Sequence, residues 1–391
     1  MINPKELIYG NHEKDSSFLL FLFYFPFIVE AQEASLEELE AVVVVSRHGV
    51  RAPTQSEKKL TTLSRYPWPD WGVKRAYLTP RGYELIRQTW SFVAKEKPFI
   101  HTGCPNTQNI QIIADVDERT IRTARALLEG LYPGCFIPIE VASEKSSSLF
   151  SPLKAKVCEI EHPQHLAKKL TQKANEIPIR FSSEIEELER ITQISFKGNL
   201  TGKASKYKVG FEGKPYLASS VIEIFALECG QWPGQLVAWN QVDETVLRRL
   251  MPLRVAVFSA LNRDMEVAQY KGSALAFKII DSLEKGKKYT FLVGHDTNLS
   301  NLGALFDLNW QIPGRAFNEN APGGYLKFEK WKVGSRSEIR ISYNALSLEQ
   351  IHAQQLHQGP IEVQIIPPGT DFDQWVHHYR KRILTRCINR K

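Results

Sequence analysis

The chain of 391 residues is long enough to bury a large core, and its 43% hydrophobic and 24% charged residues are ordinary for a globular protein. No stretch reaches the ~18 consecutive apolar residues that a membrane-spanning helix needs, so we expect no stable membrane insertion. The net charge of +7 suits anionic ligands, but the sequence contains no nucleic-acid-binding module, and we expect no nucleic-acid partner.

A strongly apolar run lies near the N-terminus, at residues 18–29. It ends in Val29-Glu30-Ala31, a small-x-small pattern followed by polar residues, which is typical of a signal-peptide cleavage site. We therefore predict that residues 1–31 are a signal peptide and that the protein is periplasmic or secreted. The first seventeen residues mix acids with lysines, so the usual basic start is missing. The alternative is a buried N-terminal element.

Strands and helices alternate in the first part of the remaining chain. The β-branched run at 42–46 is typical of a strand buried on both faces of a parallel sheet. Thr79 and Pro80 suit the cap and first position of a helix running to about residue 95. Residues 110–114 read as another core strand. Asp115 to Arg119 then open a helix that we expect to end at Gly130.

The middle of the chain has helical spacing, and the end returns to strands. Residues 160–255 are rich in lysine and glutamate with helical periodicity, interrupted by an expected exposed loop at 197–214. A further helix is expected within 247–264, after Pro252. The remaining expected elements are a strand at 289–293, a helix near 299–305 and a strand at 325–329.

This order predicts an α/β fold with a mainly parallel central sheet flanked by helices and an inserted, mostly helical second domain. We assign residues 37–157 plus 255–391 to the α/β catalytic domain and 158–254 to the helical insertion. Ligands of such sheets bind at the carboxyl ends of the parallel strands. Three predicted strand ends carry unusual polar groups: Arg47-His48-Gly49-Val50-Arg51, Asp115 to Arg119, and His295-Asp296.

These residue types suit a phosphate ester. Arg47, Arg51 and Arg119 would bind the phosphoryl oxygens through rigid guanidinium forks, and His295 could add a contact. The field of the two flanking arginines should keep His48 neutral, and a neutral imidazole can attack phosphorus to form a phosphohistidine. No metal ion and no cofactor are needed, because the arginines stabilise the charge.

The departing alkoxide needs a proton, which Asp296 can hold if its pKa is raised beside the bound anion. The same carboxylate could then activate the water that hydrolyses the intermediate. Each signal is weak alone. A bare R-H-G occurs by chance, and a His-Asp pair at a helix start is often only a cap. Their joint position after predicted strands favours the chemical interpretation.

Four motifs together resemble the histidine acid phosphatases, closest to the bacterial periplasmic acid phosphatase and phytase branch: R-H-G-V-R-A-P-T, A-D-V-D-E-R-T, G-H-D-T-N-L-x-N-L-G and P-G-G-x-L-x-F-E. The resemblance covers about residue 40 to the end and implies a phosphoglycerate-mutase-like fold. It implies His48 as nucleophile and Asp296 as proton donor. The phosphate pocket that it implies consists of Arg47, Arg51, Arg119 and His295. Thr54 matches a substrate-contacting threonine, and Glu223 an acidic residue of the cleft, unless Glu223 is simply an exposed helix residue.

The sequence has five cysteines and no C-x-x-C motif, so zinc and redox motifs are not indicated. In an exported chain, pairing with one cysteine left over is the default. The family resemblance implies two disulfides, Cys104 with Cys135 and Cys158 with Cys387. Cys229 has no evident partner, and a small buried apolar role fits it best.

We expect an acid phosphatase that acts on small phosphate monoesters, and we expect it to be a monomer. Phytase or glucose-1-phosphatase activity is the alternative. Gln55 stands where phytase-like members have a lysine, which weakens the case for phytase activity. Thr297 and Asn298 resemble the phytase motif and favour it. A phosphoglycerate-mutase-like phosphotransferase is a second enzyme class. A catalytically silent phosphate-binding or interaction protein is the non-enzymatic alternative.

Overall fold

The computed structural model describes residues 37–96, 103–142, 145–354 and 356–388. The predicted signal peptide at 1–31 lies outside the described residues. The strands are β1 (Glu37–Arg47), β2 (Ile110–Ala114), β3 (Glu140–Val141), β4 (Thr201–Ser205), β5 (Lys208–Glu212), β6 (Tyr289–Gly294), β7 (Tyr325–Val333), β8 (Arg336–Ala345) and β9 (Ile361–Ile366).

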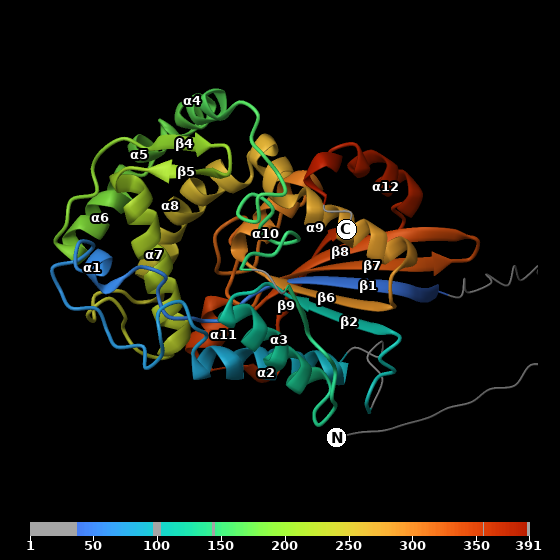
Figure 1. The fold of residues 1–391 in the computed structure, drawn as a ribbon. Coiled ribbons are helices and arrows are strands. Elements are labelled where there is room, and N and C mark those ends of the chain that lie inside the picture. The colour runs from blue at the N-terminus through green and yellow to red at the C-terminus, as the bar shows by residue number, and fades with distance from the viewer. Residues whose placement is uncertain (1–36, 97–102, 143–144, 355, 389–391) are drawn as a thin grey trace, which may run out of the picture. The chain divides into compact units, whose positions relative to one another are not determined.

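Seven strands form one mixed sheet in the order β3-β2-β6-β1-β7-β8-β9. Figure 1 shows β2, β6, β1, β7 and β8 side by side. The pairings from β3 to β1 are parallel, and those from β1 to β9 are antiparallel. The sheet is therefore less parallel than expected, because β7, β8 and β9 follow one another in sequence and pair as neighbours. The parallel part brings the carboxyl ends of β1, β2 and β6 together at one edge.

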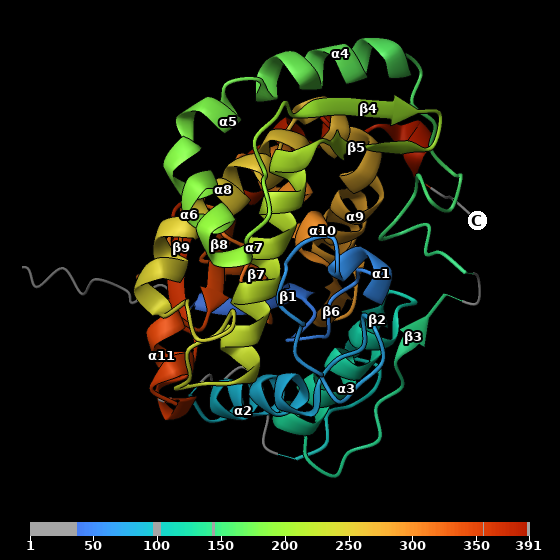
Figure 2. The same ribbon diagram turned by 90° about the vertical axis from the view of Figure 1, so that its left-hand side faces the viewer.

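Helices lie on both faces of this sheet, with α2 and α3 on one face and α9, α10 and α12 on the other (Figures 1 and 2). No helix in the described part of the chain is long and apolar enough to cross a membrane. The helices are α1 (Glu57–Leu60), α2 (Pro80–Glu96), α3 (Glu118–Leu131), α4 (Pro163–Ala174), α5 (Ile177–Arg180), α6 (Ser182–Thr192), α7 (Lys214–Gln231), α8 (Glu244–Asn262), α9 (Met265–Lys285), α10 (Asp296–Leu305), α11 (Leu348–His352) and α12 (Phe372–Arg380), with 3₁₀ turns η1 (Leu356–Gln358) and η2 (Thr385–Cys387).

The valine run of β1 is buried on both faces, as its composition predicts. Val42 and Val44 belong to the hydrophobic cluster beneath α2 and α3, whereas Val43 and Val45 belong to the cluster beneath α9 and α10. Side chains alternate between the two faces of a strand, so one run of valines serves both clusters. This double burial holds the end of β1, and the residues that follow it, in a rigid position.

A separate hydrophobic cluster joins α4, α6, α7 and α8. Figure 1 shows these helices to one side of the sheet. The described residues form one compact unit, and the assignment of 158–254 as a separate inserted domain stays a prediction. The segment 197–214 is not a simple loop, because it contains the β4–β5 hairpin. A Cβ at Gly202 would lie 2.5 Å from the Ala167 carbonyl oxygen, so this glycine allows β4 to approach α4 closely.

Two expected helix boundaries were wrong. Helix α8 begins at Glu244 and continues through Pro252, with Met251 and Leu253 buried on either side of the proline. Their burial offsets the backbone hydrogen bond that a proline cannot make. Helix α3 continues past Gly130, where a Cβ would lie 2.4 Å from the Arg87 carbonyl oxygen. Gly130 therefore permits close packing on α2 instead of ending α3.

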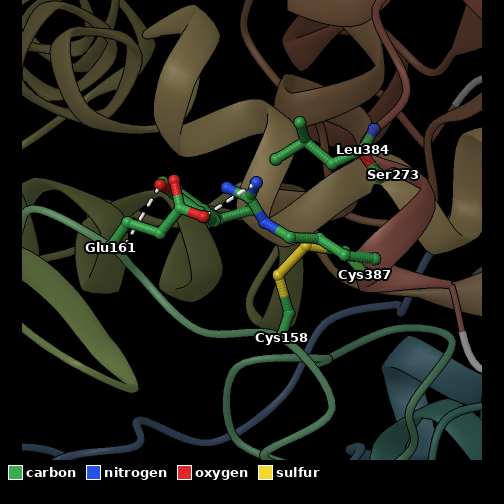
Figure 3. The surroundings of a disulfide bond; sticks show 7 residues. Cys158, Glu161, Ser273, Leu384 and Cys387 are labelled. Atoms are coloured by element: carbon green, nitrogen blue, oxygen red, sulfur yellow. Dashed lines mark hydrogen bonds and ion pairs between the residues drawn. A yellow bond between two sulfur atoms is a disulfide. The ribbon is translucent and has the colours of Figure 1, made fainter.

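Both disulfides implied by the family resemblance are present, Cys104–Cys135 and Cys158–Cys387. Figure 3 shows the second one, which ties the C-terminal turn η2 to the segment before α4. The Leu384 amide beside it donates a hydrogen bond to Ser273 Oγ on α9, at 2.9 Å. Cys229 is a buried free cysteine, as expected.

Breaking the second bridge with Cys387→Ser should lower the free energy of unfolding by about 2–5 kcal/mol, because the bridge closes a loop across 229 positions of sequence. Urea unfolding without reductant measures this loss. Cys229→Ala is the control, since it removes a buried sulfur but no bridge and should cost only about 1 kcal/mol. Equal unfolding midpoints for Cys387→Ser and the unsubstituted protein would contradict the stabilising role.

Candidate active site

The site lies where β1, β2 and β6 end side by side. The backbone amide of His48 donates to the Gly294 carbonyl oxygen at 2.9 Å, and the Asp115 amide donates to the Val293 carbonyl oxygen at 3.0 Å. These bonds extend the parallel pairing by one residue beyond the strands. Three segments that are remote in sequence therefore present their first loop residues to one region.

The imidazole of His48 is buried at the centre of this region. Its Nδ1 lies 2.8 Å from the Gly49 carbonyl oxygen, which can only accept, so Nδ1 carries the hydrogen and Nε2 keeps its lone pair. Burial, followed by the positive charges of Arg51 and Arg47, holds the pKa of His48 well below its usual value. His48 is thus a neutral imidazole, as its sequence neighbours indicate.

Three guanidinium groups surround His48, from Arg47, Arg51 and Arg119. The side chain of Arg47 donates to the Asn320 carbonyl oxygen and to Glu223, and that of Arg51 donates to the Ala52 carbonyl oxygen at 3.0 Å. The Nε atom of each of the three arginines is buried and has no hydrogen-bond partner within the described residues. Buried donors without partners are costly, and an anion with several oxygens could accept from them.

His295 faces His48 with its ring centroid 5.4 Å away. Its Nε2 lies 2.8 Å from Asp115 Oδ2 and 3.3 Å from Asp117 Oδ2. Burial opposes a charge on this imidazole, but the hydrogen bonds that it donates to both carboxylates raise its pKa above the usual value. His295 is therefore a cation at acid pH and can contribute to binding an anion.

Sequence reasoning gave no role to Asp115 and Asp117, although both stand in the A-D-V-D motif directly after β2. Asp117 also accepts a hydrogen bond from Arg119 Nη2 at 2.8 Å, so it orients a second member of the site. The ligand atoms of Asp115, Asp117 and His295 lie within 4.8 Å of one another, a spacing that can hold a metal ion. The hydrogen bonds among these residues already account for that spacing.

Asp296 begins α10 beside His295. Its Oδ1 accepts a hydrogen bond from the Thr297 amide at 2.8 Å, and its Oδ2 lies 4.0 Å from Arg47 Nη2. Burial favours the neutral acid, but the guanidinium groups of Arg47 and Arg254 outweigh burial and lower the pKa of Asp296 to about 2. The raised pKa expected beside a bound phosphate stays a prediction for the complex. The low pKa without phosphate depends on Arg254, which no sequence motif places beside Asp296.

Glu223 is not an exposed helix residue. It lies on α7 and contacts two guanidinium groups, with Arg47 near Oε1 and Arg254 Nε 3.1 Å from Oε2. Burial opposes its ionisation, but the charges of Arg47 and then Arg254 lower its pKa. Glu223 thus neutralises part of the positive field around His48.

A cleft of about 300 Å³ opens between the sheet edge and helices α7 and α8. Thr54 and Gln55 line it after β1, Phe211 lines it from the β4–β5 hairpin, and Lys271 lines it from α9. Thr54 is exposed and close to Gln55, with Oγ1 3.5 Å from the Gln55 side-chain oxygen. The cleft is therefore large enough for a small ester. Its walls combine cationic side chains, such as Arg51, with other polar and apolar ones.

A model of the histidine phosphatase superfamily (branch 2) matches residues 38–228 of the chain. The chain is 33% identical to phytase AppA of Escherichia coli K12, an alignment that covers 87% of this chain and 89% of that protein. It is 25% identical to the glucose-1-phosphatase of Providencia rettgeri, across 80% of this chain and 82% of that protein.

Solved structures of phytases have the same fold. The apo form of Hafnia alvei phytase matches with a TM-score of 0.82 and 26% identity, covering 90% of this chain and 98% of the phytase. The phytase of Citrobacter braakii matches with a TM-score of 0.82 and 28% identity, covering 91% of this chain and 100% of the phytase. The agreement extends over both the sheet and the helical segment that borders the cleft.

Proposed function

This chain belongs to branch 2 of the histidine phosphatase superfamily and is a phosphatase, and we propose that it hydrolyses phosphate monoesters at acid pH through a phosphohistidine on His48. The observation that supports this most strongly is the convergence of a neutral His48 with three guanidinium groups and the cationic His295. A nucleophile without charge can approach a phosphoryl group whose oxygens are held by cations.

In the first step, His48 Nε2 forms a bond to phosphorus while the bond from phosphorus to the ester oxygen breaks. Asp296, in its protonated form, gives its proton to that oxygen, and an alcohol leaves. The guanidinium groups of Arg47, Arg51 and Arg119 hold the nonbridging oxygens throughout. In the second step the Asp296 carboxylate takes a proton from water, whose oxygen attacks phosphorus. The nitrogen–phosphorus bond breaks, which releases phosphate and restores neutral His48.

The acid pH range follows from the charges around Asp296. Protein cations lower the pKa of this residue to about 2, so it cannot hold a proton at neutral pH. A bound phosphate dianion pairs with Arg47 and Arg51 and cancels part of their field, which raises the pKa of Asp296 in the complex. Protonated Asp296 is then most abundant at acid pH, and turnover should fall as pH rises.

The substrate class is broad in this proposal, with phytate as the second candidate. Relatives named phytases, and the cation Lys271 in the cleft, favour a polyphosphorylated substrate. Gln55 at the mouth of the cleft supplies no charge and weakens the case. Glucose 1-phosphatase activity has the support of more distant relatives. The two disulfides are consistent with an oxidising compartment, and we propose that the protein is periplasmic or secreted.

A panel of esters assayed across acid pH tests the proposal. We expect phosphate release from p-nitrophenyl phosphate, tyrosine phosphate and at least one alkyl ester, with optimum activity below pH 7. Phytate and glucose 1-phosphate, assayed beside them, rank the two narrower alternatives. Phosphate transferred to a sugar-acid acceptor, instead of water, would indicate a phosphotransferase. Tight binding of phosphate with no turnover at any pH would indicate a binding protein and would overturn the proposal.

A further inference from the structure

Arg254 on α8 contacts both carboxylates of the cleft. Its Nε lies 3.1 Å from Glu223 Oε2, and its Nη2 lies 3.2 Å from Asp296 Oδ2. Its guanidinium carbon lies 4.1 Å from the ring centroid of Phe258, one turn further along the same helix. The guanidinium stacks on the Phe258 ring and donates hydrogen bonds from two of its nitrogens, so its orientation is restricted.

The two oxygens of Asp296 have different partners. Oδ1 accepts from the backbone amide of Thr297, whereas Oδ2 faces Arg254 Nη2. Because Oδ1 is engaged by the backbone, Oδ2 is the oxygen available to hold the proton for the leaving group. A proton on Oδ2 makes this oxygen a weaker acceptor for Arg254, and the charge of Arg254 in turn disfavours that proton. The guanidinium and the catalytic proton therefore compete for one atom.

We infer that Arg254 is a positioning residue for hydrolysis, which aims the Asp296 carboxylate into the cleft and sets the pH range over which Asp296 can hold a proton. The inference rests on the proposed function, since it assigns Arg254 a role through the proton donor. Nothing in the sequence motifs indicates it, because Arg254 follows Pro252 in the middle of a helix.

Other charges also face Asp296, and their effects must be separated from that of Arg254. Arg47 and Arg51 favour the carboxylate, as does the neighbouring His295, whereas Glu223 favours the protonated acid. Lys271 on α9 is half-buried, lines the cleft and also favours the carboxylate of Asp296. A bound phosphate would pair with Arg47 and Arg51 and cancel part of their field, whereas Arg254 is held by Glu223 and stacks on Phe258. Arg254 is thus the cation whose effect on Asp296 should persist when substrate is bound.

The sign of the effect follows from the charge. An opposite charge within 4–6 Å favours the ionised form and lowers the pKa of a carboxyl group by roughly 1–3 units. Removing Arg254 should therefore raise the pKa of Asp296. Protonated Asp296 would then persist to higher pH, and the basic limb of the pH profile would move upward.

The test compares pH profiles of kcat for Arg254→Gln, Arg254→Lys and Arg249→Gln. Glycerol 2-phosphate serves as the alkyl substrate, and p-nitrophenyl phosphate as the substrate whose leaving group needs little protonation. With glycerol 2-phosphate, Arg254→Gln should shift the basic limb upward by about one pH unit and lower the maximum kcat. Arg254→Lys keeps the positive charge but loses the planar guanidinium. The basic limb of its pH profile should therefore lie closer to that of the unsubstituted enzyme.

Arg249 is the matched control, because it lies on the same helix and pairs with Glu187 outside the cleft, at 2.7 Å. Its variant should leave the limb unchanged. If the unsubstituted enzyme shows a basic limb that Arg254→Gln does not move, or moves equally with both substrates, the inference fails while the proposed function stands. If the unsubstituted protein hydrolyses no ester, the proposed function itself fails.

Discussion

Replacing His48 by alanine should abolish hydrolysis of every ester, with kcat falling by about 10⁴-fold or more. His48 is the nucleophile in the proposed reaction, and its Nε2 is the atom left with a lone pair because Nδ1 is engaged by the Gly49 carbonyl oxygen. Neighbouring side chains cannot replace it. The guanidinium groups remain protonated, and His295 is held as a cation by Asp115 and Asp117.

Two measurements separate loss of the nucleophile from loss of the fold. Substrate labelled in the phosphoryl group, quenched into alkaline denaturant where a phosphohistidine survives, should leave label on the unsubstituted enzyme and none on His48→Ala. Far-ultraviolet circular dichroism and a thermal melt should show that the variant is folded, and it should still bind inorganic phosphate through the arginines. Turnover within tenfold of the unsubstituted enzyme, or label retained by a folded His48→Ala, would refute the role of His48.

The second large effect is expected at Asp296. Asp296→Asn should lower kcat for glycerol 2-phosphate by about 10²–10⁴-fold, because an amide cannot protonate the departing alkoxide. The loss should be much smaller for p-nitrophenyl phosphate, whose phenolate leaves with little protonation. The side-chain oxygen of asparagine can still accept from the Thr297 amide, as Asp296 Oδ1 does, so the start of α10 should be preserved.

The ratio of the two losses is the decisive measurement. Asp371→Asn is the matched control, because Asp371 caps α12 by accepting from the Gln374 amide and lies outside the cleft. It should change neither rate appreciably. Equal losses on both substrates in Asp296→Asn would contradict the role of Asp296 as proton donor and would leave it a purely electrostatic or structural role.

Where a chemical group directly follows a buried strand, the sequence alone indicates its position. Arg47 and His48 follow the valine run of β1, and His295 follows β6, so their side chains must emerge at the same edge of the sheet. The register confirms this reasoning, since Arg47 pairs with Gly294. Periodicity also located β2 to the residue, because a short β-branched run between polar segments has few alternative structures.

Elements that depend on contacts with distant segments were harder to predict. The β4–β5 hairpin is rich in glycine and lysine. Its Gly202 is explained only by the close packing of α4 against β4. Helix α8 continues through Pro252 because its neighbours bury apolar side chains on both sides. Local propensity indicates a break at such positions, and tertiary packing overrides it.

The sequence by itself placed the groups that follow β1, β2 and β6 at one edge of the sheet, because covalent continuity with three buried strands leaves those groups no other position. Only the tertiary structure decided how the groups are paired and charged. Arg254 and Asp296 are 42 positions apart on different helices, yet they share a hydrogen bond, and the charge of Arg254 contributes to the low pKa of Asp296. Electrostatic energy depends on distances in space and on burial, and neither can be read from spacing along the chain.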